Sequence, residues 1–313
     1  MTPYAVVSVD GQTYLLILSN HSGQSSQHSM PDPPPLAKRK PKQVTRPPAC
    51  DDDRVVRLRY AELHCLTNFT FLEGASHADE LVVEAVELGY QALAVTDRNS
   101  LAGVVRAHAA AKESGLKLIV GAEIAPTDAA RVVLWAPDRA AYGRLSRLIT
   151  AGRCRAEKGD CHLQFDDVAE HSRGLLAGVG PEREEPLCQL ADLHAYRKLF
   201  GDRCYLLAEL HYGTDDQRRM EQLAQLAQQA NLPLVAAGDV HYHNRARMPL
   251  QHALTAIRHG TTVAELGERC LPNAERHLRP LDEIRRIFWQ YPAVLERTIE
   301  IADRCTFSLD ELR

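Results

Sequence analysis

Short apolar runs alternate with longer amphipathic stretches along most of the chain after residue 60. The runs are rich in Val, Leu, Ile and Ala and are too short for helices, so they predict buried β-strands. The predicted strands cover residues 62–66, 92–96, 116–120, 131–135, 174–179, 204–210 and 234–237. The stretches between them repeat apolar residues at helical spacing and predict helices at 79–88, 101–114, 139–150, 191–200 and 215–230. This alternation is typical of parallel βαβ units.

The predicted fold class is α/β, and about seven strand–helix units favour a closed (β/α)7 barrel. An open, doubly wound sheet has the same alternation and is the alternative. A GxGxxG motif after the first strand would favour the open sheet, and the sequence has none at that position. We therefore expect a barrel.

The two ends of the chain have other patterns. Residues 20–53 are rich in Pro, Ser, Gln and charge, which predicts a disordered leader. Before them, Asp10 and Gly11 separate two apolar runs and predict a hairpin with a type I′ turn. After His243 the pattern is mostly helical. The predicted domains are a leader at 1–59, a barrel at 60–245 and a helical linker at 246–313.

Composition narrows the class of protein. The chain has 313 residues, of which 45% are hydrophobic and 25% charged, and this is typical of a globular domain with a full core. Its net charge of -4 excludes a general basic field, so any contact with nucleic acid must be local. The eight cysteines include no CxxC pair and follow no secretory signal, which indicates reduced thiols in the cytoplasm. No apolar run approaches the roughly 20 residues of a membrane span.

Polar side chains lie within or just after several predicted strands. They are His64, Asp97, Glu123, Asp239 and His241. The carboxyl ends of parallel barrel strands meet at one end of the barrel, so these side chains are expected to converge. Asp239 and His241 are two residues apart in a segment expected to be extended, which would point them to the same side. Carboxylates with imidazoles suit a hydrolytic Zn²⁺ or Mn²⁺ site and phosphoester hydrolysis.

Each residue alone also has a simpler interpretation. Asp97 is well placed to cap a helix that begins near Ser100, because free N–H groups at a helix start need acceptors. Glu209 and His211 have the same two-residue spacing as the candidate ligands, but they are interpreted as a solvated strand end. Only the joint pattern favours a site.

Five segments together resemble the PHP domain that opens bacterial C-family DNA polymerases, closest to the error-prone branch. They are YAELHC at 60–65, FLEGAS at 71–76, AVTD at 94–97, IVGAE at 119–123 and GDVH at 238–241. Three later segments resemble the linker into the polymerase region: LTAIRHG at 254–260, PNAERHLR at 272–279 and FSLDEL at 307–312. Free-standing PHP phosphatases lack this tail. The resemblance implies a distorted PHP-type (β/α)7 barrel followed by a mostly helical linker.

The resemblance also implies a set of metal ligands, and this sequence keeps only part of it. The retained candidates are His64, Glu73, Glu123, Asp239 and His241. The positions that depart from the family pattern are Leu66, Arg98, Arg131 and Gly180. A guanidinium is permanently cationic and has no lone pair for a metal. We therefore expect a degenerate site in which Arg98 or Arg131 pairs with Glu73, Glu123 or Asp239.

The resemblance implies a domain of an error-prone DNA polymerase that acts in replication past damage and in DNA repair, with this segment as a scaffold. It implies DNA and proteins such as the sliding clamp as partners, and Mg²⁺ in the polymerase region. For this segment the resemblance implies at most a reduced site that would hold Zn²⁺ or Mn²⁺. The alternative is a phosphoesterase or 3′–5′ exonuclease with such a site. A third reading is a module that binds partners through the basic residues of 38–46.

Overall fold

The computed structural model describes residues 4–9, 12–17, 58–180 and 190–312, and the chain divides into two compact units, 1–43 and 44–313. In the first unit, β1 (Tyr4–Val9) pairs antiparallel with β2 (Gln12–Ile17), so that Val9 lies opposite Gln12. The predicted turn at Asp10 and Gly11 and the predicted disordered leader at 20–53 lie outside the described residues. The domain boundaries inferred from the sequence remain predictions.

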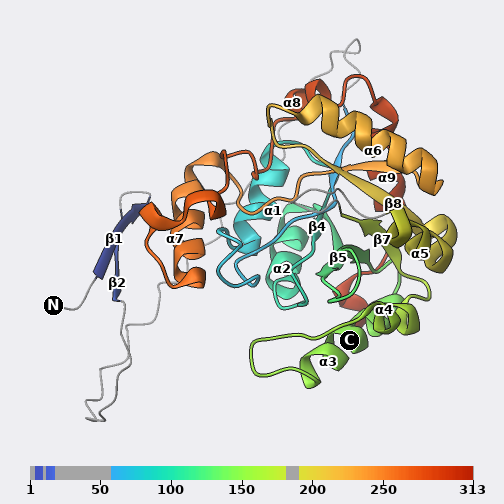
Figure 1. Ribbon diagram of the computed structural model, residues 1–313, viewed down its shortest axis with the longest axis horizontal. Coiled ribbons are helices and arrows are strands. Elements are labelled where there is room, and N and C mark those ends of the chain that lie inside the picture. Colours follow the sequence, from blue (N-terminus) through green and yellow to red (C-terminus); the bar gives the residue numbers. More distant parts are fainter. Residues whose placement is uncertain (1–3, 10–11, 18–57, 181–189, 313) are drawn as a thin grey trace. The chain divides into compact units, whose positions relative to one another are not determined.

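The second unit is built around a seven-stranded sheet whose strands follow one another in chain order (Figure 1). The strands are β3 (Ala61–Glu62), β4 (Ala92–Val95), β5 (Lys117–Ile124), β6 (Val132–Trp135), β7 (Leu176–Val179), β8 (Cys204–Glu209) and β9 (Leu234–Ala237). Just beyond β3 and β9, the Leu66 N–H donates to the Val240 carbonyl (2.8 Å) and the Val240 N–H to the His64 carbonyl (2.9 Å). The first and last strands are therefore joined, which confirms the barrel over the open sheet.

One strand runs against the predicted direction. The pattern indicated parallel strands throughout, but β6 is antiparallel to both β5 and β7. The connection at 125–131 is too short for a crossover helix, because a parallel return needs roughly a dozen residues. The reversal places the amino end of β6, with Arg131, beside the carboxyl ends of the other strands.

Helices surround the sheet (Figure 1). They are α1 (Ala78–Glu87), α2 (Val104–Ser114), α3 (Arg139–Cys154), α4 (Phe165–His171), α5 (Leu190–Phe200) and α6 (Asp216–Ala230). After β9 come α7 (Met248–His259), α8 (Leu281–Ile287) and α9 (Pro292–Arg304). The largest differences from the predicted bounds are at α3, which continues to Cys154 and does not end at 150, and at α2, which begins after Gly103 and not at 101. None of the helices that the structure describes has the length and apolar character needed to cross a membrane.

Two hydrophobic cores follow from the alternation of side chains along the strands. One set packs between the sheet and the helices, and includes Leu93, Val95, Leu134 and Leu206. The other set faces the barrel interior, and includes Leu63, Ile119, Trp135, Tyr205 and Leu207. Ile299, Ile301 and Ala302 of α9 belong to this interior core.

Helix α9 closes the end of the barrel opposite the polar residues. The Thr298 hydroxyl oxygen accepts a hydrogen bond from the N–H of Ala61, the first residue of β3. Arg297 Nη1 donates to the carbonyl of Leu234, the first residue of β9. These contacts fix α9 to the amino ends of parallel strands, so the carboxyl ends are left for the site.

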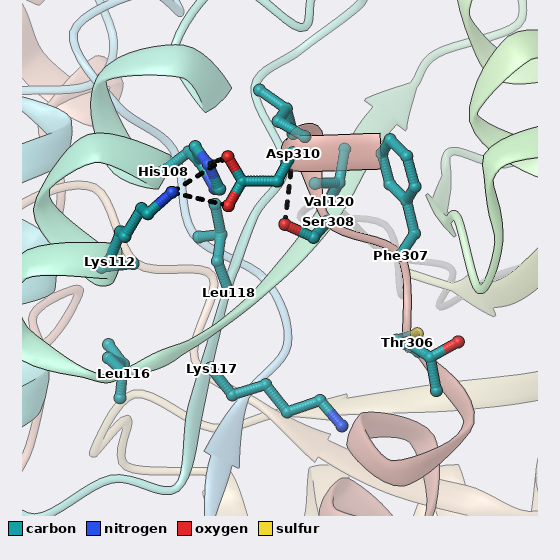
Figure 2. Close-up of a pocket in the computed structure, with 13 residues that line it drawn as sticks. His108, Lys112, Leu116, Lys117, Leu118, Val120, Thr306, Phe307, Ser308 and Asp310 are labelled. Atoms are coloured by element: carbon teal, nitrogen blue, oxygen red, sulfur yellow. Dashed lines mark hydrogen bonds and ion pairs between the residues drawn. The ribbon is translucent and has the colours of Figure 1, made fainter. Parts of the chain in front are cut away.

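The chain after α9 covers the hairpin formed by β5 and β6, where no crossover helix lies. Thr306 and Phe307 donate their N–H groups to the Pro137 carbonyl, and the Phe307 ring stacks on Tyr142 of α3. A cavity of about 260 Å³ remains between this segment, α2 and β5 (Figure 2). Lys112 of α2 and Asp310 form an ion pair of 2.8 Å on its wall, which ties the segment to the helix.

Candidate functional site

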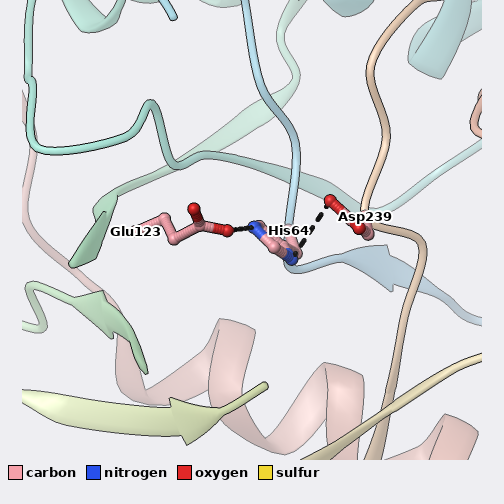
Figure 3. A group of neighbouring side chains, drawn as sticks. All are labelled: His64, Glu123 and Asp239. Carbon is pink, nitrogen blue, oxygen red and sulfur yellow. Dashed lines mark ion pairs between the residues drawn. The ribbon is translucent and has the colours of Figure 1, made fainter. Parts of the chain in front are cut away.

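Three buried side chains meet at the carboxyl ends of the barrel strands (Figure 3). They are His64 after β3, Glu123 near the end of β5 and Asp239 after β9. His64 Nε2 lies 3.0 Å from Glu123 Oε2, and His64 Nδ1 lies 3.9 Å from Asp239 Oδ1. The potential ligand atoms of all three lie within 4.8 Å of one another. The sequence therefore predicted the residues and the place of this cluster.

Glu209 at the end of β8 is a fourth member. Its Oε1 lies 2.7 Å from His64 Nδ1, and its side chain is only 2% exposed. The interpretation of Glu209 as a solvated strand end is therefore wrong. Tyr205 and Leu207 of the same strand face the barrel interior, and the two-residue period carries Glu209 to that face. His211 is not in the cluster, because its Nε2 contacts the Gly238 carbonyl at 2.9 Å.

The position of His64 is fixed by a carboxylate that the sequence reasoning did not single out. Glu62 is buried, and its Oε1 accepts hydrogen bonds from the N–H groups of Leu63, His64 and Gly238. Burial raises the pKa of Glu62. A Cβ on Gly238 would lie 2.6 Å from Glu62 Oε2, so a glycine is required there. This carboxylate joins the strand that carries His64 to the strand that carries Asp239.

His64 is a cation in this setting. Burial alone would lower its pKa, but hydrogen bonds with Glu123 and Glu209 and the charges of Glu209 and Asp239 raise the pKa to about 9. Both ring nitrogens then carry protons near neutral pH and form ion pairs with carboxylates, Nδ1 with Glu209 and Nε2 with Glu123. An imidazolium has no lone pair with which to bind a metal.

Arg98 and Arg131 each bridge two carboxylates. Arg98 donates from Nε to Glu123 Oε1 and from Nη1 to Glu73 Oε1, both at 2.5 Å. Arg131 donates from Nη1 to Glu123 Oε2 at 2.8 Å and from Nη2 to Glu209 Oε2 at 2.5 Å. Burial alone would raise the pKa of Glu123, but the two guanidinium groups hold it well below its usual range. The ion pairs expected from the sequence are present.

Gly180 makes room for one of these bridges. This residue lies where the resemblance places a later metal ligand, and its N–H donates to the Arg131 carbonyl at 3.1 Å. A Cβ at Gly180 would lie 3.0 Å from both Cζ and Nε of Arg131. The absence of a side chain at 180 therefore allows the Arg131 guanidinium to lie over that position.

Two more arginines reach the cluster from the chain that follows the barrel. Arg258 of α7 pairs with Glu73, and Arg276 pairs with Asp239. The backbone of Arg276 is fixed as well, because its carbonyl accepts from the His241 and Tyr242 N–H groups at 2.9 and 3.2 Å. The sequence reasoning missed both residues, since it assigned them to the linker.

Asp239 and His241 are adjacent, but not for the predicted reason. Asp239 has a φ of +43°, in the left-handed region, so the segment is not extended there. His241 Nε2 still lies 3.2 Å from Asp239 Oδ1, and both side chains are buried. Neither His241 nor Glu73 belongs to the three-residue group with metal-like spacing. Glu73 joins the cluster only through Arg98.

Asp97 does not cap a helix. Its Oδ1 accepts from the Thr67 N–H (2.7 Å) and from the Thr70 hydroxyl (2.7 Å), and α2 begins only after Gly103. The capping interpretation is therefore wrong: Asp97 fixes the loop after β3.

The residues as arranged do not fit a metal ion. His64, Glu123 and Asp239 are close enough for one ion, and they form the one group with that spacing among the described residues. However, both nitrogens of His64 face carboxylates, and Arg98, Arg131 and Arg276 pair with the carboxylates of the group. An ion would have to displace a guanidinium and deprotonate His64. The arrangement fits a network of ion pairs.

Comparisons with known proteins agree with this fold. A family model described as PHP domain matches residues 62–230. An error-prone DNA polymerase of Rhodopirellula baltica is 48% identical over 273 residues, which are 83% of this chain and 24% of that protein. The error-prone DNA polymerase of Pseudomonas fluorescens is 50% identical over 81% of this chain and 24% of its own length. The chain thus spans about a quarter of the length of these relatives.

A solved structure from Bifidobacterium adolescentis, described as a metal-dependent phosphoesterase, is 16% identical with a TM-score of 0.47. The match covers 74% of this chain and 96% of that one.

Proposed function

Because the chain belongs to the PHP domain family, we propose that it forms the amino-terminal PHP domain of an error-prone DNA polymerase and acts there as a scaffold. The arginines of the pocket support this role. Arg98 and Arg131 each bridge two carboxylates, and a guanidinium holds such groups together without catalysing hydrolysis. The identity to error-prone polymerases supports the choice of polymerase.

In this proposal, DNA synthesis past damage and in repair belongs to the polymerase region, which lies outside this chain. That region would hold Mg²⁺ and contact DNA, and partners such as the sliding clamp would bind the complete polymerase in the cytoplasm. Paired metal-binding carboxylates carry nucleotide transfer in two-metal sites. The PHP domain would contribute a rigid body on which those parts are mounted.

A second candidate function is a metal-dependent phosphoesterase or 3′–5′ exonuclease with a reduced site. One observation favours it: the ligand atoms of His64, Glu123 and Asp239 lie within 4.8 Å of one another. If one guanidinium moved aside, these residues could hold a single Zn²⁺ or Mn²⁺ ion, which would supply an activated water.

Metal content separates the two functions. The purified chain is incubated with Zn²⁺ or Mn²⁺, freed of loose ions, and analysed by mass spectrometry for bound metal. The same samples are assayed with a chromogenic phosphodiester and with single-stranded DNA. We expect substoichiometric metal and no activity that a chelator removes. Stoichiometric metal together with chelator-sensitive hydrolysis would establish the second function in place of the first.

Membership of a polymerase is tested separately in the native cells. An antibody raised against this chain should detect a product of the relatives' length, and peptides from that product should include this sequence. Detection of this chain only as an independent protein would contradict a role as a polymerase domain.

A further inference from the structure

The first half of α3 carries positive charge that no carboxylate balances. Its arginines there are Arg139 and Arg147, which are exposed, and Arg144, which is half-buried. Within the described part of the chain, none of the three forms an ion pair, and Arg144 donates from Nε to the carbonyl of Arg173. The helix contains no Asp or Glu from its first residue to its last. Asp138, which precedes it, caps the helix by accepting from the Ala141 N–H at 2.7 Å.

Helix geometry places these arginines side by side. Arg139, Gly143 and Arg147 follow one another at intervals of four residues, so they lie in one row along the helix. A Cβ on Gly143 would lie 3.8 Å from Nη2 of Arg147, so this guanidinium lies over the position next to the glycine. Arg144 flanks the row, three residues before Arg147. We name these four residues the Arg139 face.

Three features of the Arg139 face are unfavourable for the helix itself. Arg139 is the first helical residue, where a cation opposes the helix dipole. Gly143 favours the helix less than alanine would, and neither a positive φ nor a close contact requires a glycine there. Arg144 and Arg147 are like charges three residues apart, which repel. Local rules are broken in this way mainly at functional sites, and an anion bound at this face would relieve the repulsion.

The composition of this face indicates which anion it suits. None of the exposed large hydrophobic residues that the structure describes lies on α3, and the ring of Tyr142 is stacked on Phe307. The face therefore lacks the apolar anchors of a protein interface and the free aromatic ring that stacks an unpaired base. Guanidinium groups remain, and they bind phosphate oxygens. Contacts to phosphates alone are typical of sequence-independent binding to a duplex.

We propose that the Arg139 face binds the phosphate backbone of duplex DNA, with one phosphate over Gly143 between Arg139 and Arg147. The missing side chain at 143 lets the phosphate approach the helix closely. Arg139 and Arg147 are separated by about 12 Å along the helix axis, a length over which a duplex presents several phosphates. The chain as a whole is acidic, so this contact depends on local charge. The choice of DNA over RNA rests on the proposed function, but the phosphate chemistry does not.

Fluorescence anisotropy of the full chain with a labelled DNA duplex tests the arginines. Arg139→Gln and Arg147→Gln should each weaken binding roughly tenfold at about 50 mM salt, and each should reduce the slope of log affinity against log salt by about one. Arg286→Gln is the matched control. Arg286 is an exposed helical arginine of α8 that pairs with Asp282, and its loss should leave affinity and slope unchanged.

Gly143→Glu separates binding from stability. The new carboxylate would lie four residues from both Arg139 and Arg147 and pair with them, so urea unfolding should show a chain at least as stable as the original. Binding of the duplex should nevertheless fall at least roughly tenfold, because the carboxylate takes the place of the phosphate. Gln225→Glu adds the same charge at an exposed position of α6, on another side of the barrel (Figure 1), and should leave the affinity unchanged. The basic leader is present in every variant, so differences between them isolate the Arg139 face.

Equal affinity of Gly143→Glu and Gln225→Glu would overturn the inference, as would an unchanged salt slope in both arginine variants. Failure of the unchanged chain to bind the duplex in low salt would also overturn it. None of these results bears on metal content or on the length of the native product. The proposed function and the DNA-binding face can therefore fail independently.

Discussion

At position 180 the chain has no side chain, and the guanidinium of Arg131 lies against that position. Two of the four departures from the family's ligand pattern, Gly180 and Arg131, therefore lie against each other. A Cβ at 180 would lie closer to Arg131 than Cβ atoms normally approach a neighbour, so the guanidinium would have to shift. Sequence reasoning found both positions as departures from a ligand pattern but could not find the coupling, because 48 residues of chain separate them and only the fold brings them together.

Gly180→Ala should destabilise the protein by about 1–3 kcal/mol, because the new Cβ forces the Arg131 guanidinium away from Glu123 or Glu209. Urea unfolding measures the change. Gly143→Ala in α3 is the control: its Cβ would meet only Arg147 Nη2, at 3.8 Å, and alanine favours a helix. That variant should be as stable as the original or more stable.

The coupling can be measured in the background of Arg131→Met, which itself should cost about 3–5 kcal/mol in free energy of unfolding because it removes one cation from two buried carboxylates. In the Arg131→Met background, Gly180→Ala should change the free energy of unfolding only slightly, since no guanidinium remains to be displaced. If Gly180→Ala instead lowers the free energy of unfolding equally in both backgrounds, the clash at position 180 is with something other than Arg131.

His64 gives the pocket a defined dependence on pH. Its folded-state pKa of about 9 lies above the ordinary value, so its contribution to stability is complete below about pH 6.5. That contribution is lost as the pH rises through 9, because the neutral imidazole donates only one hydrogen bond to the carboxylates. The nuclear magnetic resonance signal of the His64 ring should titrate with a midpoint near 9. A midpoint near 6.5 would show that the carboxylates do not hold the proton.

At the scale of elements, the position of every barrel strand could be predicted, but the direction of β6 could not. A buried apolar run looks the same in either direction, since its period of two is unchanged by reversal. The only available signal was the short connection at 125–131, which excludes a crossover helix. Direction matters here because it determines that Arg131, which precedes a strand, reaches the same end of the barrel as residues that follow strands.

The role of α9 was also beyond the sequence pattern, which indicated only that the chain after His243 is mostly helical. Its contact with β3 gives a prediction at this scale. Thr298→Val keeps the shape but removes the hydroxyl that accepts from the Ala61 N–H, at a site where both residues are fully buried. The unpaired N–H should cost about 1–3 kcal/mol in chemical unfolding.

Thr150→Val is the matched change in the exposed part of α3, where the hydroxyl only donates to the Ser146 carbonyl. It should alter stability by less than about 0.5 kcal/mol. Equal costs for the two valine variants would contradict the assignment of Thr298 as the residue that fixes α9 to the barrel.

At the scale of the whole molecule, the segment predicted as a linker packs against the pocket and against the barrel interior. Arg258 and Arg276 pair with pocket carboxylates, and Ile299, Ile301 and Ala302 fill one end of the barrel interior. The family resemblance supplied the order of the segments along the chain. It could not predict these contacts. A linker that packs against the barrel and a linker that only joins two domains can have the same helical sequence pattern.

A chain that ends at residue 245, the predicted boundary of the barrel, should therefore lose cooperative unfolding. It would leave Glu73 and Asp239 without two arginines and expose the interior core at the amino ends of the strands. Circular dichroism during urea unfolding provides the measurement. Deletion of residues 1–43, a separate compact unit, is the control and should leave the transition unchanged. A cooperative transition at the original midpoint in the shorter chain would support the boundary at 245.

The cations that face the buried carboxylates in this pocket are side chains of the same polypeptide. They are synthesised in fixed ratio to the carboxylates, one set per molecule, and no chelator can extract them. In the proposed scaffold role, folding of this pocket would therefore make no demand on the zinc or manganese supply of the cell, and metal starvation would not deplete it. The cations that balance these carboxylates are encoded in the amino-acid sequence and do not have to be taken up from the surroundings.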